Sequence, residues 1–335
     1  MIPASPLPPQ PVVDWRLAWR QSLTDPRQLL ARLALADRAD ELLAAVDTGF
    51  AMRVPESYLR RMRPGDADDP LLRQVLPAAA ELQAAPGYGT DAVGDLAASR
   101  APGVIHKYHG RVLLIATGAC AINCRYCFRR HFPYADELAA RDRWRAALDY
   151  IAGDDSVQEV ILSGGDPLAL ATGKLAEFTD ALAGIGHVRS LRLHTRLPIV
   201  LPERVDAALL AWLGGLPWPV TVVVHANHGN EIDEQTSAAL HALRDGGAHL
   251  LNQSVLLAGV NDSLPALEQL SWRLHQAATL PYYLHLLDKV AGAAHFHVDE
   301  VAARHLHAQL RARLPGYLLP RLVREIAGEP AKTPL

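Results

Sequence analysis

Cysteine is scarce in this sequence, because the 335 residues contain only three and all three lie within residues 120–127. An odd number of cysteines in a chain without a secretory signal argues against disulfide bonds. Residues 1–13 lack the basic region and apolar run of a signal peptide and predict a flexible, proline-rich arm. No apolar run is long and uncharged enough to cross a bilayer, so we expect a cytoplasmic protein without a membrane partner.

An excess of charge of either sign is also absent. The formal net charge is −3, which gives no overall field that would attract nucleic acid or anionic lipid. An RNA-binding protein that uses the basic stretch CRYCFRRHF is an alternative, but the charge and the lack of aromatic stacking motifs weigh against it, and we expect no nucleic-acid partner. With 50% hydrophobic residues, the chain can bury a large core.

The chain changes in pattern near residue 105. Residues 14–100 predict a helical and irregular segment, with an apolar pattern from Trp15 to Leu35 and a further helix over 40–51. No site residue is predicted there. Beyond it, short apolar runs alternate with helical patterns. Strands are expected at 112–116, 159–162, 190–194, 221–225, 250–256 and 282–287, and helices at 139–151, 175–182, 205–213, 234–243, 267–277 and 301–314.

Six strand–helix units predict an α/β fold, a partial (β/α)6 TIM-like barrel, because a closed barrel would need two more units. We divide the chain into an N-terminal arm and helical wrapping segment (1–100), the barrel (101–315) and a C-terminal segment (316–335).

Polar residues follow the predicted strands, where the active sites of such barrels lie. They are residues 120–127, 163–166, 194–196, 225–228, 252–254 and 288. Six such groups on one rim predict a functional site.

The cysteines have the spacing Cx3Cx2C, and three thiolates so spaced can bind one metal centre. A [4Fe–4S] cluster held by three cysteines leaves one iron free for a small molecule. Two alternatives are buried structural cysteines and a Cys3His zinc-binding module completed by His131. The pair Gly164-Gly165 lets backbone approach a ligand, or simply forms a tight turn after the strand.

Together, the cysteine loop after the first strand and the Gly-Gly-Asp turn after the second resemble the radical S-adenosylmethionine superfamily. This resemblance implies a barrel of the radical S-adenosylmethionine type. It implies that Cys120, Cys124 and Cys127 bind a [4Fe–4S] cluster. It also implies that S-adenosylmethionine contacts Ser163, Gly164, Gly165, Asp166 and Gln253.

A closer resemblance covers most of the chain, through HKYHGRVLLI, ILSGGDPL, LHTRLPIVLPER, NQSVLLAGVND and EPAKTPL. These stretches resemble lysine 2,3-aminomutases, above all the shorter branch that makes β-lysine for elongation factor P. That resemblance implies pyridoxal 5′-phosphate as a second cofactor, bound as a Schiff base to Lys332, with Arg111 and Tyr108 near its phosphate and ring. Without the resemblance, Lys332 would be an ordinary lysine of the tail.

The resemblance also assigns substrate contacts. Arg129 matches the arginine that pairs with the substrate carboxylate, for which a guanidinium fork is suited. Asp288 and Glu325 match two aspartates that bind the side-chain ammonium, and Glu325 is one methylene longer than the family residue. The alternative is that Arg125, Arg129 and Arg130 form a solvated basic patch.

The implied enzyme is an isomerase that converts L-α-lysine into β-lysine, expected as the R form, for an elongation factor P ligase pathway. An electron donor such as flavodoxin would reduce the cluster. An aminomutase for arginine or glutamate is the alternative. The longer aminomutases carry extra C-terminal cysteines that bind zinc, and this chain has none, so their zinc and tetrameric assembly are not expected here.

Overall fold

The computed structural model describes residues 14–43, 47–140 and 144–335. The proline-rich arm predicted at 1–13 lies outside the described residues. So do residues 44–46 of the helix predicted over 40–51 and residues 141–143 of the helix predicted over 139–151.

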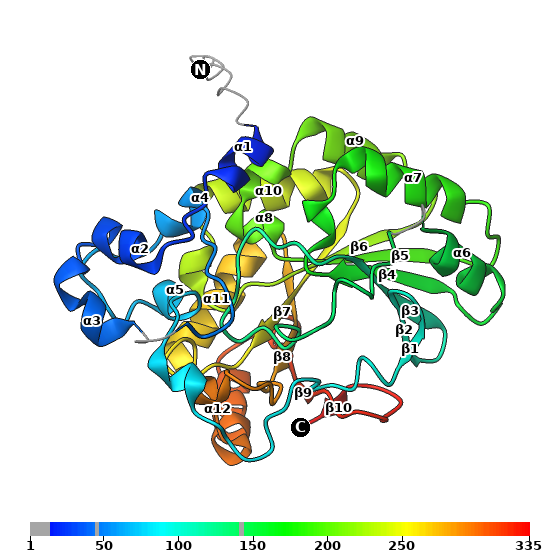
Figure 1. Ribbon diagram of the computed structural model, residues 1–335. Coiled ribbons are helices and arrows are strands. Elements are labelled where there is room, and N and C mark those ends of the chain that lie inside the picture. The colour runs from blue at the N-terminus through cyan, green and yellow to red at the C-terminus, as the bar shows by residue number, and fades with distance from the viewer. Residues whose placement is uncertain (1–13, 44–46, 141–143) are drawn as a thin grey trace.

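One ten-stranded sheet forms the centre of the molecule, and its strands are neighbours in the order in which they occur in the chain (Figure 1). The strands are β1 (Ser99–Ala101), β2 (Val104–Tyr108), β3 (Arg111–Thr117), β4 (Glu159–Gly164), β5 (Ser190–Thr195), β6 (Val220–Val224), β7 (His249–Val255), β8 (Leu280–His285), β9 (Arg321–Arg324) and β10 (Thr333–Pro334). Pairing is parallel from β3 to β9, and the pairs β1–β2, β2–β3 and β9–β10 are antiparallel.

The six predicted strands correspond to β3 through β8, which confirms the partial α/β barrel. Strand β6 shows why the strands could be predicted, since four of its five residues are buried valines. The sequence did not predict β1, β2, β9 or β10, which extend the sheet at both edges. In β9, only Leu322 and Val323 are buried, between two arginines, and this apolar run is too short to predict a strand.

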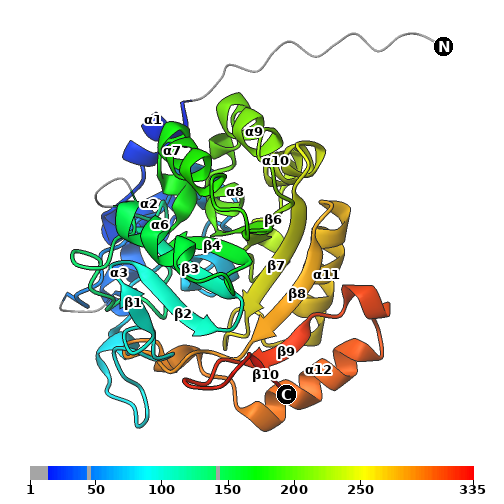
Figure 2. The same cartoon turned by 90° about the vertical axis from the view of Figure 1, so that its right-hand side faces the viewer.

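Helices connect the parallel strands and lie outside the sheet (Figure 2). The helices are α1 (Trp15–Arg20), α2 (Pro26–Arg32), α3 (Ala39–Leu42), α4 (Glu56–Leu59), α5 (Pro70–Arg73), α6 (Arg145–Ala152), α7 (Thr172–Leu182), α8 (Leu197–Val200), α9 (Ala207–Gly214), α10 (Glu234–Asp245), α11 (Leu264–Gln276) and α12 (Glu300–Arg311). No helix of the described chain has the length and apolarity required to cross a membrane.

Two predicted helices are shorter than expected. Helix α3 ends at Leu42, and residues 47–51 are not helical, because Gly49 has a φ of +70° and its N–H is bound by the Asp47 carboxylate. Helix α6 begins at Arg145, after the buried Trp144, whose positive φ of 64° precludes a continuous helix from residue 139.

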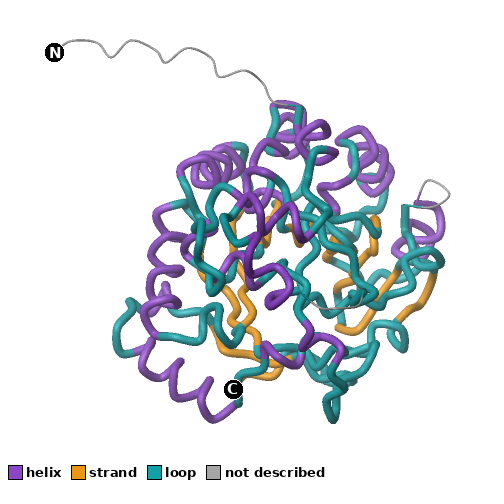
Figure 3. The backbone as a smooth tube through the Cα atoms, turned by 60° about the vertical axis from the view of Figure 1, so that its left-hand side comes forward, coloured by secondary structure: helices purple, strands orange, loops and turns teal. Residues whose placement is uncertain are grey.

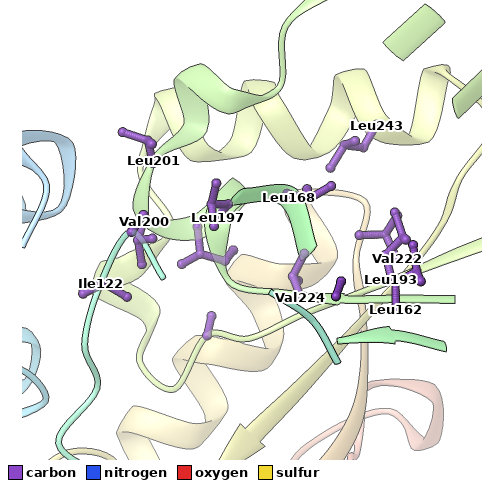
Figure 4. Packing of buried hydrophobic residues seen from close by; sticks show 14 of the residues in the cluster. Ile122, Leu162, Leu168, Leu193, Leu197, Val200, Leu201, Val222, Val224 and Leu243 are labelled. Atoms are coloured by element: carbon purple, nitrogen blue, oxygen red, sulfur yellow. The ribbon is translucent and has the colours of Figure 1, made fainter. Parts of the chain in front are cut away.

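The main core lies between the sheet and its helices. Figure 4 shows Leu162, Leu193 and Val222 of three adjacent strands packed near Leu168 and Leu243. Helices surround the strands (Figure 3).

The N-terminal helices α2, α3 and α5 lie together at the left of Figure 1. Their segment is bonded to the barrel by side chains that reach helix α8. Ser57 donates to the carbonyl of Val200 at 3.0 Å, and Arg61 donates to the carbonyl of Ile199 at 2.7 Å. The segment therefore contacts the same end of the barrel as the cysteine loop.

Candidate active site

A cavity of about 700 Å³ lies at the carboxyl ends of the parallel strands. All the predicted site residues line it: Tyr108, Arg111, Cys120, Cys124, Cys127, Arg129, Ser163, Gly164, Gly165, Asp166, Gln253, Asp288, Glu325 and Lys332. They come from β2, β3, β4 and β7 and from the segments that follow β3, β4, β8 and β9. The cavity brings these residues together, and their individual roles remain predictions.

The three cysteines lie on the loop after β3, with free and half-buried thiols. Burial, and after it the neighbouring Cys124, raises the pKa of Cys127 to about 11. His131 is exposed and its Nε2 lies 3.1 Å from the carbonyl of Ala291, so the zinc alternative lacks its fourth ligand. Nor does any group of three or more ligating side chains in the described chain suit a single metal ion. Three soft thiolates without a fourth protein ligand fit a [4Fe–4S] cluster with one open iron.

The Gly164-Gly165 turn packs directly against the start of the cysteine loop. A Cβ atom would lie 2.6 Å from the carbonyl oxygen of Thr117 at Gly164 and 2.5 Å from that of Ala119 at Gly165. Gly164 also has a φ of +119°. The Gly165 N–H donates to Thr117 at 2.6 Å, and the Asp166 N–H donates to Ala119 at 2.9 Å. The glycines therefore permit a close approach between two protein segments, in addition to any approach to a ligand.

The Asp166 carboxylate is fully used by protein contacts. It accepts hydrogen bonds from the N–H of Leu168, Arg196 and Leu197 and from the hydroxyl of Thr195, at 2.6–3.0 Å. Burial nevertheless raises the pKa of Asp166 to about 6. These bonds fix the end of β5 against the turn that follows β4.

Arg129 is buried and held in place from two sides. Its Nε donates to Asp95 at 2.7 Å, and its Nη1 donates to the hydroxyl of Ser163 at 3.1 Å. Lys107 contacts the other oxygen of Asp95 at 2.6 Å. Burial alone would raise the pKa of Asp95, but Arg129 and Lys107 hold it below its ordinary value. Within the described chain, Nη2 of Arg129 makes no hydrogen bond and is free to donate to an anion.

The side chains of the other two arginines of the loop are also buried. Arg125 donates from Nε to Glu81 at 2.8 Å, and Arg130 donates from Nη2 to the same carboxylate at 2.8 Å. The alternative of a solvated basic patch is therefore wrong. Glu81 and Asp95 both belong to the N-terminal segment, where no site residue was expected. Their carboxylates gave no signal in the sequence because their partners lie far along the chain.

The C-terminal hairpin brings Lys332 into the cavity. Thr333 of β10 pairs with Arg324 of β9, which places Lys332 beside Glu325. The Lys332 ammonium lies 2.6 Å from one oxygen of Glu325, and Lys107 lies 2.9 Å from the other. Burial alone would raise the pKa of Glu325, but the two lysines lower it to about 2. The tail is thus ordered by ion pairs across the open side of the barrel.

Asp288 differs from the other acidic residues of the cavity, because its side chain makes no hydrogen bond or ion pair with any residue that the structure describes. Burial, and after it the Glu325 carboxylate, raises the pKa of Asp288 to about 7. A cationic ligand beside it would provide the missing partner.

Three histidines at strand ends also line the cavity. Nε2 of His194 and Nε2 of His285 are buried and have no hydrogen-bond partner in the described chain. Nε2 of His225 lies 3.0 Å from Nε2 of Gln253. Burial lowers the pKa of all three, in His225 to about 3, so the rings are neutral. Unpaired polar atoms on the wall fit a polar occupant. From the sequence, His194 and His225 were predicted only as strand-end residues, and His285 was not predicted as a site residue.

No protein-family profile matches the chain. Among curated proteins, it is 47% identical over 324 residues to the L-lysine 2,3-aminomutase of Escherichia coli, covering 96% of this chain and 94% of that protein. It is 43% identical to the L-lysine 2,3-aminomutase of Haemophilus influenzae, covering 98% of each chain. For the protein of that name from Clostridium subterminale, identity is 34%, over 96% of this chain and 77% of the relative.

Among solved structures, a radical SAM methyltransferase from Sphaerobacter thermophilus aligns with a TM-score of 0.44 and 18% identity, covering 66% of this chain and 68% of that one. This likeness is too distant to add to the relatives above. The curated relatives match nearly the whole chain. The chain therefore belongs to the L-lysine 2,3-aminomutase family of isomerases.

Proposed function

We propose that this protein is a radical S-adenosylmethionine isomerase, dependent on pyridoxal 5′-phosphate, that converts L-α-lysine into β-lysine, expected as the R form. One observation carries the proposal. The cysteine thiols after β3 and the Lys332 ammonium of the C-terminal hairpin line the same cavity as Arg129 and Asp288. A radical source, a cofactor lysine and groups for a dipolar, cationic substrate thus have access to one another.

In this proposal, Cys120, Cys124 and Cys127 hold a [4Fe–4S] cluster, and the turn of residues 163–166, together with Gln253, holds S-adenosylmethionine. When bound and reduced, the cluster would supply the one electron needed to cleave S-adenosylmethionine into methionine and a 5′-deoxyadenosyl radical able to take a hydrogen atom from the substrate. The carboxylate of Asp166 is occupied by four protein hydrogen bonds. Its contribution would be to hold the turn in shape.

Lys332 would hold pyridoxal phosphate, with Arg111 and Tyr108 near the phosphate and ring. The Arg111 guanidinium lies over the Tyr108 ring, 4.7 Å from its centre, so the two side chains form one surface of the cavity. When bound, the cofactor would supply a conjugated system able to delocalise an unpaired electron of the substrate. The neutral, buried rings of His194 and His285 offer unpaired nitrogens on the same wall.

The side chains that would bind the substrate can be assigned from their charges. Arg129 would bind the carboxylate of lysine through the guanidinium nitrogen that Asp95 and Ser163 leave free. Asp288 and Glu325 would bind the side-chain ammonium. Two carboxylates on one side of the cavity favour a cationic side chain over that of glutamate or alanine.

The test is an anaerobic assay of the purified, iron-reconstituted protein with S-adenosylmethionine, pyridoxal phosphate, a reductant and a panel of lysine, arginine and glutamate. We expect β-lysine as the main product. Iron, sulfide and pyridoxal phosphate should be measured in the same preparation. A protein with both cofactors bound that forms no β-lysine would refute the proposal, and conversion of arginine alone would reassign the substrate.

We further propose that the β-lysine serves the ligase that modifies elongation factor P, and that a flavodoxin donates the electron. The near full-length match to the short relatives supports this assignment. Reaction product added to elongation factor P with its ligase should give a mass increase on the factor. Reduced flavodoxin should replace the chemical reductant in the assay.

A further inference from the structure

Arg196 contacts the cysteine loop from a different part of the barrel. It follows the last residue of β5, is only 6% exposed, and lines the cavity. Its Nη1 lies 2.6 Å from Sγ of Cys124. Within the described chain, no other side chain donates a hydrogen bond to any of the three cysteine sulfurs.

The guanidinium is fixed from the side away from the sulfur. Nη2 donates to Glu231 Oε2 at 2.9 Å and to Gln74 Oε1 at 2.8 Å. Glu231 is itself completely buried, and its Oε1 accepts from the N–H of Asn227 at 2.8 Å and from the N–H of His228 at 3.1 Å. The carboxylate is therefore anchored by backbone and cannot follow a movement of the arginine.

The backbone of Arg196 is fixed as well. Its N–H donates to the Asp166 carboxylate at 2.6 Å, on the turn beside the cysteine loop. Tyr126, two residues after Cys124, contacts Nη1 through its hydroxyl and accepts from Nδ2 of Asn227 at 2.7 Å. The position of Arg196 is thus set by β5, the turn after β4 and the segment around Glu231, and its Nη1 also contacts Tyr126 of the cysteine loop.

This geometry has an electronic consequence for a cluster bound by Cys124. Reduction adds one negative charge to the iron–sulfur unit, and donors to its sulfurs stabilise the reduced form. Arginine remains charged at every physiological pH. Its partner Glu231 lies on the far side of the guanidinium, so the positive end of this ion pair faces the sulfur.

We propose that Arg196 is a positioning residue that raises the reduction potential of the cluster through its contact with Cys124, and that Glu231 limits the size of this effect. The inference rests on the proposed [4Fe–4S] cluster and not on the proposed substrate.

The test is a redox titration of the reconstituted protein, without lysine, in which electron paramagnetic resonance measures the reduced cluster. Arg196→Gln should lower the midpoint potential. At a fixed solution potential, the ratio of reduced to oxidised cluster should fall about tenfold, which equals about 59 mV for one electron. Arg204→Gln is the matched control, because Arg204 is a completely buried arginine whose Nε donates to the Leu168 carbonyl at 2.7 Å. It should leave the midpoint potential unchanged.

Glu231→Gln provides a second, opposite test. It removes the negative charge behind the guanidinium, so the midpoint potential should rise, whereas general damage to the site would not reverse the direction. If the Arg196→Gln variant binds no cluster, the midpoint potential of the Glu231→Gln variant alone tests the inference. A midpoint potential equal to that of the wild type in either variant with full iron content would overturn the inference. A wild-type protein that binds no cluster at all would refute the proposed function instead.

Discussion

The two ends of the cavity are built differently. Around the cysteines, the buried arginine side chains are all paired with buried carboxylates: Arg125 and Arg130 share Glu81, Arg129 pairs with Asp95, and Arg196 pairs with Glu231. Around Lys332, one carboxylate, Glu325, is shared by two lysines, and Asp288 has no partner in the described chain. The cysteine end has its charges paired before any ligand binds, whereas the lysine end has charges that can exchange partners when cofactor and substrate arrive.

The substitution Lys332→Ala tests the lysine end most directly and should have the largest effect. It should abolish the pyridoxal absorbance and the aminomutase activity, because no amine remains to hold the cofactor, while the iron content stays unchanged. Absorbance spectra measure the pyridoxal cofactor at the lysine end, and iron analysis measures the cluster at the cysteine end. The control is Lys174→Ala, at an exposed lysine of α7 outside the cavity. Persistent pyridoxal absorbance in Lys332→Ala would contradict the assignment of this lysine.

Arg129→Ala should have the next largest effect. Hydrogen bonds to charged groups contribute about 1.5–3 kcal/mol, so kcat/KM for lysine should fall about 10- to 100-fold. The cluster and the pyridoxal absorbance should remain. Steady-state kinetics measure the loss, and Arg311→Ala, at an exposed arginine of α12, is the control. An unchanged kcat/KM would show that another group binds the carboxylate.

Asp288 should give the substrate reaction a dependence on pH. Its pKa is raised to about 7, so the carboxyl is neutral below that pH and cannot pair with an ammonium group. We therefore expect kcat/KM for lysine to approach a tenfold fall per pH unit below 7. Asp288→Asn should lower kcat/KM above pH 7 and remove this dependence. Retention of the same pH profile in the variant would assign the titration to another group.

Gly165→Ala should have the smallest effect and tests the cysteine end. The added Cβ would meet the Ala119 carbonyl at 2.5 Å, and such overpacking typically costs about 1–3 kcal/mol of stability. The midpoint temperature of thermal unfolding and the iron content of the reconstituted protein should both fall. Gly173→Ala is the control, because a Cβ there has no neighbour within 4 Å. If the two variants were equally stable, the cysteine loop would be able to shift and accommodate the added Cβ atom at little cost in stability.

The central strands could be predicted because burial on both faces produces runs such as residues 220–224, which are valines with one threonine. The hairpin of β9 and β10 could not be predicted, since β10 has two residues and β9 has two buried ones. Helix ends at Leu42 and Arg145 depend on single backbone angles, which apolar periodicity does not record.

The candidate site shows the same division. The cysteines are close in sequence, so their spacing alone predicts a metal centre. Lys332 and Glu325 were predicted only through the resemblance to a family. Asp95 and Lys107 were missed, because their pairing with Arg129 and Glu325 depends on contacts between distant segments. Charge pairs of this kind leave no periodic pattern in a sequence.

The contact of Gly164 and Gly165 with residues 117–119 has a consequence for the chemical reactivity of the metal-free protein. The three half-buried thiols line the cavity and lie on the loop that this contact holds, so an alkylating reagent in the cavity would meet them in a fixed arrangement while the contact is intact. A change in the rate of thiol alkylation in Gly165→Ala would then report a change in the conformation of the loop. It would do so without iron, substrate or activity.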